Sequence, residues 1–188
     1  KAVTTNRGTI ETPRVLVAAG PWSQMVLSKI GIELPLETSR HQVIMVRRPE
    51  ELLPGHPIVG DVIQEMSFRP DRSGLTIIGV GDEPADLHDY DQGVDPSTVH
   101  KVLGRLVNRM PAMSEGYFRG GWSGLFTVTP DWHPIIGPVV ETEGLYCAVG
   151  FSGHGFKLSP MIGLCMAELI AQGAASTFDI SPFRANRF

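Results

Sequence analysis

Hydrophobic residues fall in short runs separated by turns rich in glycine and proline. Two runs are continuous. One is VLVAA at residues 15–19, which ends a strand predicted over residues 9–19, and the other is LYCAV at residues 145–149. Continuous apolar runs of this length, bounded by glycine, are typical of strands buried on both faces of a sheet. Such strands need helices on both faces, and the chain supplies few of them. We therefore expect the chain to be part of a larger protein.

The middle of the chain has an antiparallel pattern. A strand is predicted over residues 42–47, and residues 65–69 and 75–80 flank the turn PDRSG, as in a β-hairpin. Residues 82–95 are acidic and are predicted to form a surface loop. A further strand over 116–128 is interrupted by three glycines, which suggest a bulge or a close approach of the backbone to a ligand. They are Gly120, Gly121 and Gly124.

Three helices are predicted. One covers residues 22–30 and ends at Gly31; a second covers 97–109, with Asp95-Pro96 as its cap; a third covers 157–171 and ends at Gly173. Pro160 is placed in the first turn of the third helix, where a missing N–H costs nothing. The fold class is therefore α/β at the two ends of the chain with an antiparallel insert, or α+β overall.

Composition excludes several classes of protein. The net charge of the 188 residues is −4 and the basic residues are dispersed, so we expect no nucleic-acid partner. No apolar run is long enough for a bilayer, and no signal peptide precedes the first strand, so no membrane partner is expected either. Cys147 and Cys165 lie in apolar stretches without metal-ligand spacing. Buried free thiols, no metal site and a reducing cytoplasm are the predictions.

The strongest candidate site is the sequence GFSGHGFK, residues 150–157, between a buried strand and a helix. Its three glycines let the main chain approach a flat ligand. The helix that follows directs unpaired N–H groups at that ligand, which suits a reduced flavin or a phosphate. A glycine-rich strand-to-helix turn without any ligand remains the alternative.

A second segment, TVTPDWHPIIG at residues 127–137, has a structural and a functional interpretation. The structural interpretation is a rigid turn in which Asp131 bonds nearby backbone groups. His133, between Trp132 and Pro134, is more often a packed or surface residue than a base.

Three ordered segments resemble the D-amino acid oxidase superfamily: VLVAAGPWS at 15–23, TPDWHPIIG at 129–137 and GFSGHGFK at 150–157. The nearest branch is that of sarcosine oxidase, including the β subunit of the heterotetrameric enzymes, and of the dimethylglycine-type enzymes. The segment SPFR at 181–184 resembles the C-terminal tail of that branch. The resemblance implies a partial FAD-binding, Rossmann-like domain over residues 1–34 and 135–188. An inserted antiparallel sheet, the substrate domain, would cover 35–134. The family's N-terminal GxGxxG segment, which holds the pyrophosphate, is absent.

The resemblance also implies roles for individual residues. Lys157 would bind the substrate carboxylate, and His154 would be a hydrogen-bonding or catalytic residue. Phe126 would contact the substrate. Arg69 is a further candidate for substrate contact because of its place in the predicted hairpin, not because of the resemblance, and a solvated strand position is the alternative for it. The predicted cofactor-binding residues are Gly20, Trp22, Gly150, Phe151, Ser152, Gly153, His154, Gly155, Phe156 and Lys157. Trp22 is also expected to pack against the helix that it begins.

Three positions depart from the pattern of the monomeric sarcosine oxidases. Gly124 stands where those enzymes bond the flavin through cysteine, so we expect FAD to be non-covalent in this half. The aromatic residue that follows is Phe126, without a hydroxyl. Ile77 stands where those oxidases place a lysine over the flavin, which favours a dehydrogenase or a multi-subunit enzyme over an oxidase.

The sequence thus predicts an FAD-dependent amine or amino-acid oxidoreductase. It would oxidise a glycine- or sarcosine-like amino acid, or an N-methylated amine, by hydride transfer to flavin N5, which requires no dedicated base. The chain alone is expected to be inactive and to need a missing N-terminal half or a partner subunit. The alternatives are a non-catalytic binding module of a flavoenzyme complex and a truncated fragment.

Overall fold

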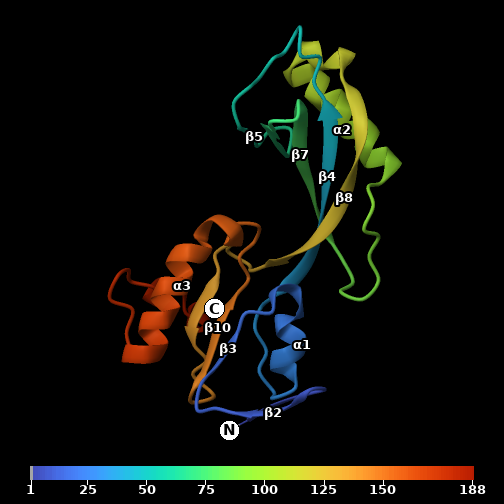
Figure 1. Cartoon of the computed structure of the whole chain (residues 1–188). Helices are drawn as coiled ribbons and strands as arrows, with labels where there is room; N and C mark the ends of the chain where they lie inside the picture. The colour runs from blue at the N-terminus through green and yellow to red at the C-terminus, as the bar shows by residue number, and fades with distance from the viewer. Residues whose placement is uncertain (1) are drawn as a thin grey trace. The chain divides into compact units, whose positions relative to one another are not determined.

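The computed structural model describes residues 2–188, except the side chain of Asp82. The chain forms two compact units (Figure 1). The first contains the residues up to Thr38 together with Phe126–Phe188, and the second is Ser39–Leu125. The assignment of residues 1–34 and 135–188 to an FAD-binding domain, and of 35–134 to a substrate domain, stays a prediction. No helix among the described residues is long and apolar enough to cross a membrane.

The first unit is built on a sheet of three strands in the order β3-β10-β9. Strand β10 (Leu145–Val149) is parallel to β3 (Val15–Val17) and antiparallel to β9 (Ile135–Pro138). Its residues alternate between two cores: Leu145, Cys147 and Val149 pack in one cluster, whereas Ala148 packs in another. The prediction of a strand buried on both faces is therefore confirmed. The pairing of β10 with β9 was not predicted.

Two helices cover the faces of this sheet. The first cluster contains Leu27 of α1 (Ser23–Ser28), and the second contains Cys165, Met166 and Leu169 of α3 (Gly155–Gln172). Both cysteines are buried free thiols, as predicted. Burial raises the pKa of the Cys147 thiol to about 11, so this group stays protonated and unreactive at neutral pH.

The start of the chain differs from the prediction of one strand over residues 9–19. Strands β1 (Ala2–Thr5) and β2 (Gly8–Glu11) form an exposed antiparallel hairpin, and the chain breaks before β3. Pro13 lies in the break and lacks an N–H for a sheet ladder. The Thr12 hydroxyl donates to the Arg14 carbonyl at 2.8 Å and closes a local turn there. Short 3-10 helices lie at Gly20–Trp22, Pro111–Glu115, Ser181–Phe183 and Ala185–Arg187.

The second unit is a five-stranded sheet with one helix. The strand order is β5 (Val59–Asp61), β6 (Met66–Pro70), β7 (Leu75–Pro84), β4 (Glu37–Arg47) and β8 (Tyr117–Val128). The predicted hairpin is confirmed as β6–β7, and β7 extends into the predicted loop. Helix α2 (Pro96–Arg109) packs on one face through Val102 and Leu106, which lie in one core with Ile44, Phe68 and Ile78.

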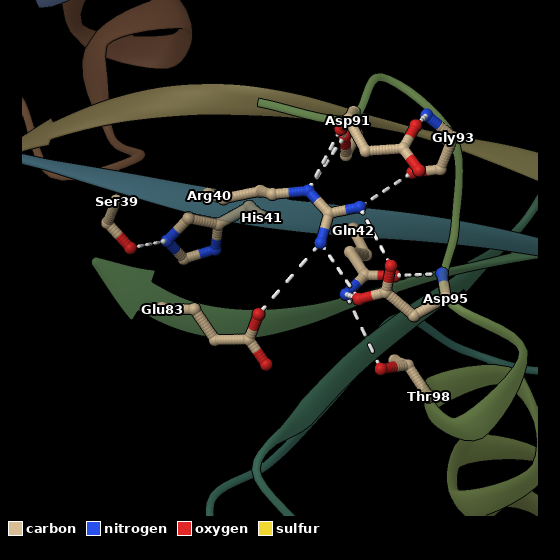
Figure 2. A network of polar contacts seen from close by, with 10 residues as sticks. Ser39, Arg40, His41, Gln42, Glu83, Asp91, Gly93, Asp95 and Thr98 are labelled. Carbon is tan, nitrogen blue, oxygen red and sulfur yellow. Dashed lines mark hydrogen bonds and ion pairs between the residues drawn. The ribbon is translucent and has the colours of Figure 1, made fainter. Parts of the chain in front are cut away.

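A buried polar network joins the loop before α2 to the sheet (Figure 2). The Arg40 guanidinium donates to both carboxylate oxygens of Asp95, at 2.8 and 3.2 Å, and to the carbonyls of Asp91 and Gly93. Gln42 Nε2 donates to Asp95 at 2.7 Å. The sequence suggested Asp95 as a helix cap, but its side chain makes no cap bond. The buried guanidinium needs a counter-charge, and this need outweighs the cap.

One glycine of β8, Gly121, is explained by the packing of the strands. A Cβ on Gly121 would lie 2.2 Å from the Val43 carbonyl oxygen of β4, so the close approach is to a neighbouring strand. At Gly124 nothing lies within 4 Å of a built Cβ. Gly121 is thus required by strand packing, whereas Gly124 has free space around it.

Candidate functional site

The candidate site lies at one edge of the sheet in the first unit. Because β3 and β10 are parallel, with Val17 opposite Cys147, their carboxyl ends meet at the same edge. The turn at Gly20–Trp22 follows β3, and residues 150–154 follow β10. In open sheets of parallel strands this edge is where ligands bind. The structure therefore brings together the two segments predicted to bind the cofactor.

The turn after β10 has an unusual backbone that its own hydrogen bonds stabilise. Gly150, Ser152 and Gly153 have φ angles of 68°, 48° and 81°. Ser152 is a non-glycine residue in the left-handed region, which costs about 1–2 kcal/mol. Its N–H donates to the Thr127 carbonyl at 2.9 Å, and its buried hydroxyl donates to the Gly150 carbonyl at 3.3 Å. These bonds hold the turn in one conformation.

Two glycines of the turn are required by the packing of the chain itself. A Cβ on Gly150 would lie 2.4 Å from Thr129 Cγ2, and one on Gly153 would lie 2.7 Å from the Phe126 ring. Sequence reasoning explained these glycines by a flat ligand alone. The structure adds a second reason and places Phe126 directly against the turn.

Helix α3 begins at Gly155, two residues earlier than predicted, with His154 as its N-cap residue. No side chain caps this end. The first N–H groups of a helix have no partner within the helix, so those of Gly155, Phe156 and Lys157 remain available to an acceptor. Phe156, the second residue of α3, is 98% exposed. The free donors and the positive end of the helix dipole fit an anionic group such as the edge of a flavin.

Pro160 is not in the first turn of α3, because the helix starts earlier than predicted. It is the sixth helical residue and cannot donate to the Phe156 carbonyl. The Ser159 hydroxyl donates to that carbonyl instead, at 2.9 Å. The serine thus satisfies the acceptor that the proline leaves unpaired.

His154 is a neutral hydrogen-bonding group in this arrangement. Partial burial lowers its pKa, and electrostatic interactions with Lys157 and His133 lower it further. Its Nδ1 lies 3.3 Å from the Ser152 carbonyl oxygen, which can only accept, so Nδ1 carries the proton. Nε2 is then a free acceptor. A catalytic role for His154 stays a prediction.

Asp131 organises a turn rather than a reaction. It accepts a bidentate pair from Arg187, at 2.8 and 3.1 Å, and the His133 N–H at 3.0 Å. These bonds, with the Arg187 pair as the largest cause, lower the pKa of Asp131 far below its usual value. The structural interpretation of this segment is therefore the better one. His133 stacks on Phe183 of the C-terminal tail.

One predicted substrate-binding residue, Arg69, does not belong to the first unit. Arg69 is in the second unit, on the exposed side of β6, opposite the buried Met66 and Phe68. Its role in substrate binding stays a prediction.

Among residues 2–188 no group of three or more His, Cys, Asp or Glu side chains has the arrangement of a metal site. Sequence reasoning missed Ser152 as the residue that shapes the turn, since serine is uncommon in the left-handed region.

Comparison with known proteins places this chain in a family. Residues 1–169 match the family described as DAO, FAD dependent oxidoreductase. The chain is 27% identical to glycine oxidase from Geobacillus kaustophilus over 97% of the chain and 47% of that protein. It is 30% identical to FAD-dependent oxidoreductase domain-containing protein 1 from Bos taurus, over 95% and 40%. Its identity with monomeric sarcosine oxidase from Bacillus sp. is 28%, over 98% and 50%.

Solved structures agree with this assignment. L-proline dehydrogenase from P. horikoshii has a TM-score of 0.87 at 27% identity, over all of this chain and 50% of that one. Glycine oxidase from Geobacillus kaustophilus has a TM-score of 0.83 at 26% identity, over all of this chain and 49% of that one. The chain thus spans about half the length of the relatives it matches. It belongs to the DAO family of FAD-dependent oxidoreductases.

Proposed function

We propose that the complete protein oxidises a glycine- or sarcosine-like amino acid, or an N-methylated amine, by hydride transfer to the N5 atom of non-covalently bound FAD. Glycine oxidase and monomeric sarcosine oxidase among its relatives support this substrate class. The observation that carries the proposal is the open turn at residues 150–157, with its uncapped helix end. We also propose the cytoplasm as its location, because its cysteines are buried free thiols.

In this reaction the protein's own residues would bind the cofactor and orient the substrate. The N–H groups at the start of α3 and the turn at Gly20–Trp22 would hold the cofactor. When bound, FAD supplies the two-electron acceptor that takes the hydride from the carbon beside the amine, and water hydrolyses the resulting imine. No nucleophile–histidine–acid grouping is needed for such a reaction, which relies on orientation and the exclusion of water.

Lys157 is the proposed partner of the substrate carboxylate. It is exposed at the third position of α3, and no described carboxylate forms an ion pair with it. A lysine at the N-terminal end of a helix opposes the dipole. A bound anion would be attracted by both the ammonium group and the helix end, so the position favours a carboxylate ligand.

Replacing Lys157 with methionine tests this role in the complete protein. We expect KM for the amino-acid substrate to rise about 10- to 100-fold while flavin content is unchanged, since a charged hydrogen bond is lost. Rates are measured with an artificial electron acceptor. Reaction with oxygen is expected to be slow, because Ile77 stands where the related oxidases have a lysine that promotes it. Lys101→Met, an exposed lysine of α2, is the control. An unchanged KM for Lys157→Met would remove the assigned role.

The surface of the first unit fits a complementary half of the protein. Helix α3 buries one side and exposes apolar side chains on the other, including Phe156, Met161 and Leu164. A helix that is apolar on all sides is covered on all sides. Strand β3 pairs with β10 on one edge only among the described strands. We propose that an N-terminal half with a strand–GxGxxG–helix segment covers these surfaces and holds the pyrophosphate.

Titration with FAD separates this proposal from a non-catalytic binding module. The isolated chain should bind FAD weakly, with a Kd above about 100 μM, because half of the cofactor has no anchor. Adding the N-terminal half in trans should restore micromolar binding, measured by flavin fluorescence quenching, and acid should release the flavin. Weak binding that the N-terminal half does not improve would favour the non-catalytic module, a subunit or binding domain of a flavoenzyme complex.

A further inference from the structure

Arg187 holds two segments of the first unit together. Its Nε and Nη2 donate to the two carboxylate oxygens of Asp131, at 2.8 and 3.1 Å, and Nη2 also donates to the His133 carbonyl at 2.7 Å. Its Nη1 donates to the carbonyls of Phe183 and Arg184, at 2.9 and 3.2 Å. Every N–H of the guanidinium therefore has an acceptor. A side chain occupied in this way, and only 17% exposed, acts on the protein itself rather than on a ligand.

The segment that Arg187 holds has a strained backbone. Trp132 has a φ of 61°, a left-handed conformation that a non-glycine residue adopts at an energetic cost. The guanidinium binds the residues on both sides of it, at the carboxylate of Asp131 and the carbonyl of His133. Conformations of this kind persist where the surrounding contacts fix them, and they cluster at functional sites. The Trp132 side chain is 42% exposed, so burial of its ring does not explain the conformation.

Thr129 connects this segment to the turn after β10. Its buried hydroxyl donates to the His133 carbonyl at 2.7 Å and lies 3.2 Å from Asp131 Oδ1. Its N–H donates to the Ser152 hydroxyl at 3.4 Å, and its Cγ2 leaves no room for a Cβ on Gly150. Thr129 therefore shares its acceptors with the guanidinium on one side and forms a wall of the turn on the other.

The strain of the two segments meets at this threonine. Among the described residues of the first unit, Trp132 and Ser152 are the non-glycine residues with a left-handed backbone. The Trp132 N–H donates to the Thr129 carbonyl at 3.1 Å, and the Thr129 N–H donates to the Ser152 hydroxyl. Strained residues keep their conformation only when such contacts over-determine it. A change in the position of Thr129 is therefore expected to change the backbone of the turn.

We propose that Arg187 is a positioning residue for FAD. Acting through Asp131 and Thr129, it holds the wall of the turn at Gly150–Gly153 and so fixes the backbone conformation of the proposed cofactor site. This role rests on the proposed function, because it takes that turn as the cofactor site. Arg187 itself contacts neither flavin nor substrate, since all of its donors are occupied. Its loss releases Asp131 and the His133 carbonyl, and the turn then adopts conformations that bind FAD less tightly.

The Kd for FAD, measured by flavin fluorescence quenching on the apo form of the complete protein, tests this role. We expect Arg187→Met to raise Kd about tenfold or more, because methionine keeps the aliphatic stem and removes a bidentate, charged contact. At saturating FAD the visible circular dichroism of the bound flavin should also change, which a general loss of stability would not produce.

Arg184→Met is the matched control. It removes a guanidinium of the same segment with which no described carboxylate forms an ion pair. Kd should stay within about twofold of the wild-type value, because an exposed charge of this kind contributes little. In the apo-protein, the Ser152 amide, which donates to the Thr127 carbonyl, should exchange its hydrogen faster in Arg187→Met than in the control.

A double-mutant cycle shows whether Arg187 acts through Asp131. If it does, Arg187→Met/Asp131→Ala should bind FAD within about threefold of the weaker single variant, because the second change removes a contact that is already lost. Two effects that multiply would mean that the residues act independently, and would contradict the route through Asp131.

Arg187→Lys is the milder variant, to be used if methionine prevents folding. It keeps the charge but replaces the planar fork with a single ammonium group, so it should still raise Kd about threefold or more. A folded Arg187 variant that binds FAD as tightly as the wild type overturns the positioning role and leaves the proposed function intact. A wild-type protein that does not bind FAD overturns both.

Discussion

Gly150→Ala is expected to lower the free energy of unfolding of the complete protein by about 2 to 5 kcal/mol. Two costs add at this position. Alanine at a φ of 68° costs about 1–2 kcal/mol. The new Cβ would lie 2.4 Å from Thr129 Cγ2 and 3.0 Å from Leu36 Cδ2, and such overpacking costs about 1–3 kcal/mol. Urea unfolding, followed by tryptophan fluorescence, measures the change. Flavin content should fall with it, because this turn is the proposed cofactor site.

Gly104→Ala is the matched control for this substitution. Gly104 lies in the interior of α2, and nothing lies within 4 Å of its built Cβ. Alanine there should raise the free energy of unfolding by about 0.5–1 kcal/mol, since glycine is the weaker helix former. If both variants change stability by the same small amount, the turn is not constrained by packing as described.

Asp95→Ala is expected to lower the free energy of unfolding by about 2–3 kcal/mol. The Arg40 side chain is only 10% exposed, and Asp95 is its bidentate partner. Breaking a fully buried pair costs about 3–5 kcal/mol, and the cost is smaller here because the Asp95 side chain is 35% exposed. Loss of the pair should also release the loop before α2, which hydrogen exchange of the Gly93 and Asp95 amides would detect.

The control is an exposed ion pair of the same unit. Arg47 lies 3.5 Å from Glu50, and both side chains are largely exposed. Glu50→Gln should change stability by less than about 0.5 kcal/mol. An equally small effect of Asp95→Ala would contradict the importance of the buried network.

The Asp95 contribution should depend on pH in a defined direction. The hydrogen bond from Arg40 lowers the pKa of Asp95 in the folded protein. A carboxylate with a lowered pKa contributes stability above its unfolded pKa of about 3.9 and loses it as pH falls through the folded value. The stability difference between the wild type and Asp95→Ala should therefore be full at pH 6–7 and shrink in stronger acid.

Local patterns predicted the elements whose residues interact with near neighbours. The strand at Leu145–Val149 has the predicted bounds, and α2 is within one residue of its prediction. The β6–β7 hairpin follows from its turn residues, because the Asp71 side chain accepts the N–H groups of Ser73 and Leu75. Gly173 ends α3 in the left-handed conformation, as its position implied. Each of these features depends on residues close together in the chain.

Distant contacts explain where the predictions were wrong. Asp95 has the sequence context of a helix cap, yet Arg40, 55 residues away, binds its carboxylate. Gly121 is explained by the carbonyl of Val43 on the neighbouring strand and not by a ligand. Nothing in the local pattern of these residues identifies their partners. In each case a buried charge or a close backbone contact outweighed the local preference.

The sequence by itself determined the family, the strand-to-helix turn at residues 150–157 and the burial of both cysteines, because these depend on ordered motifs and on apolar runs. Only the tertiary structure decided that this turn lies at the same sheet edge as Gly20–Trp22, that Phe126 packs on it and that α3 begins at Gly155 without a side-chain cap. The physical reason is that a site of this kind is assembled from strand ends far apart in the chain. Their meeting is set by parallel pairing and core packing, which no single segment encodes.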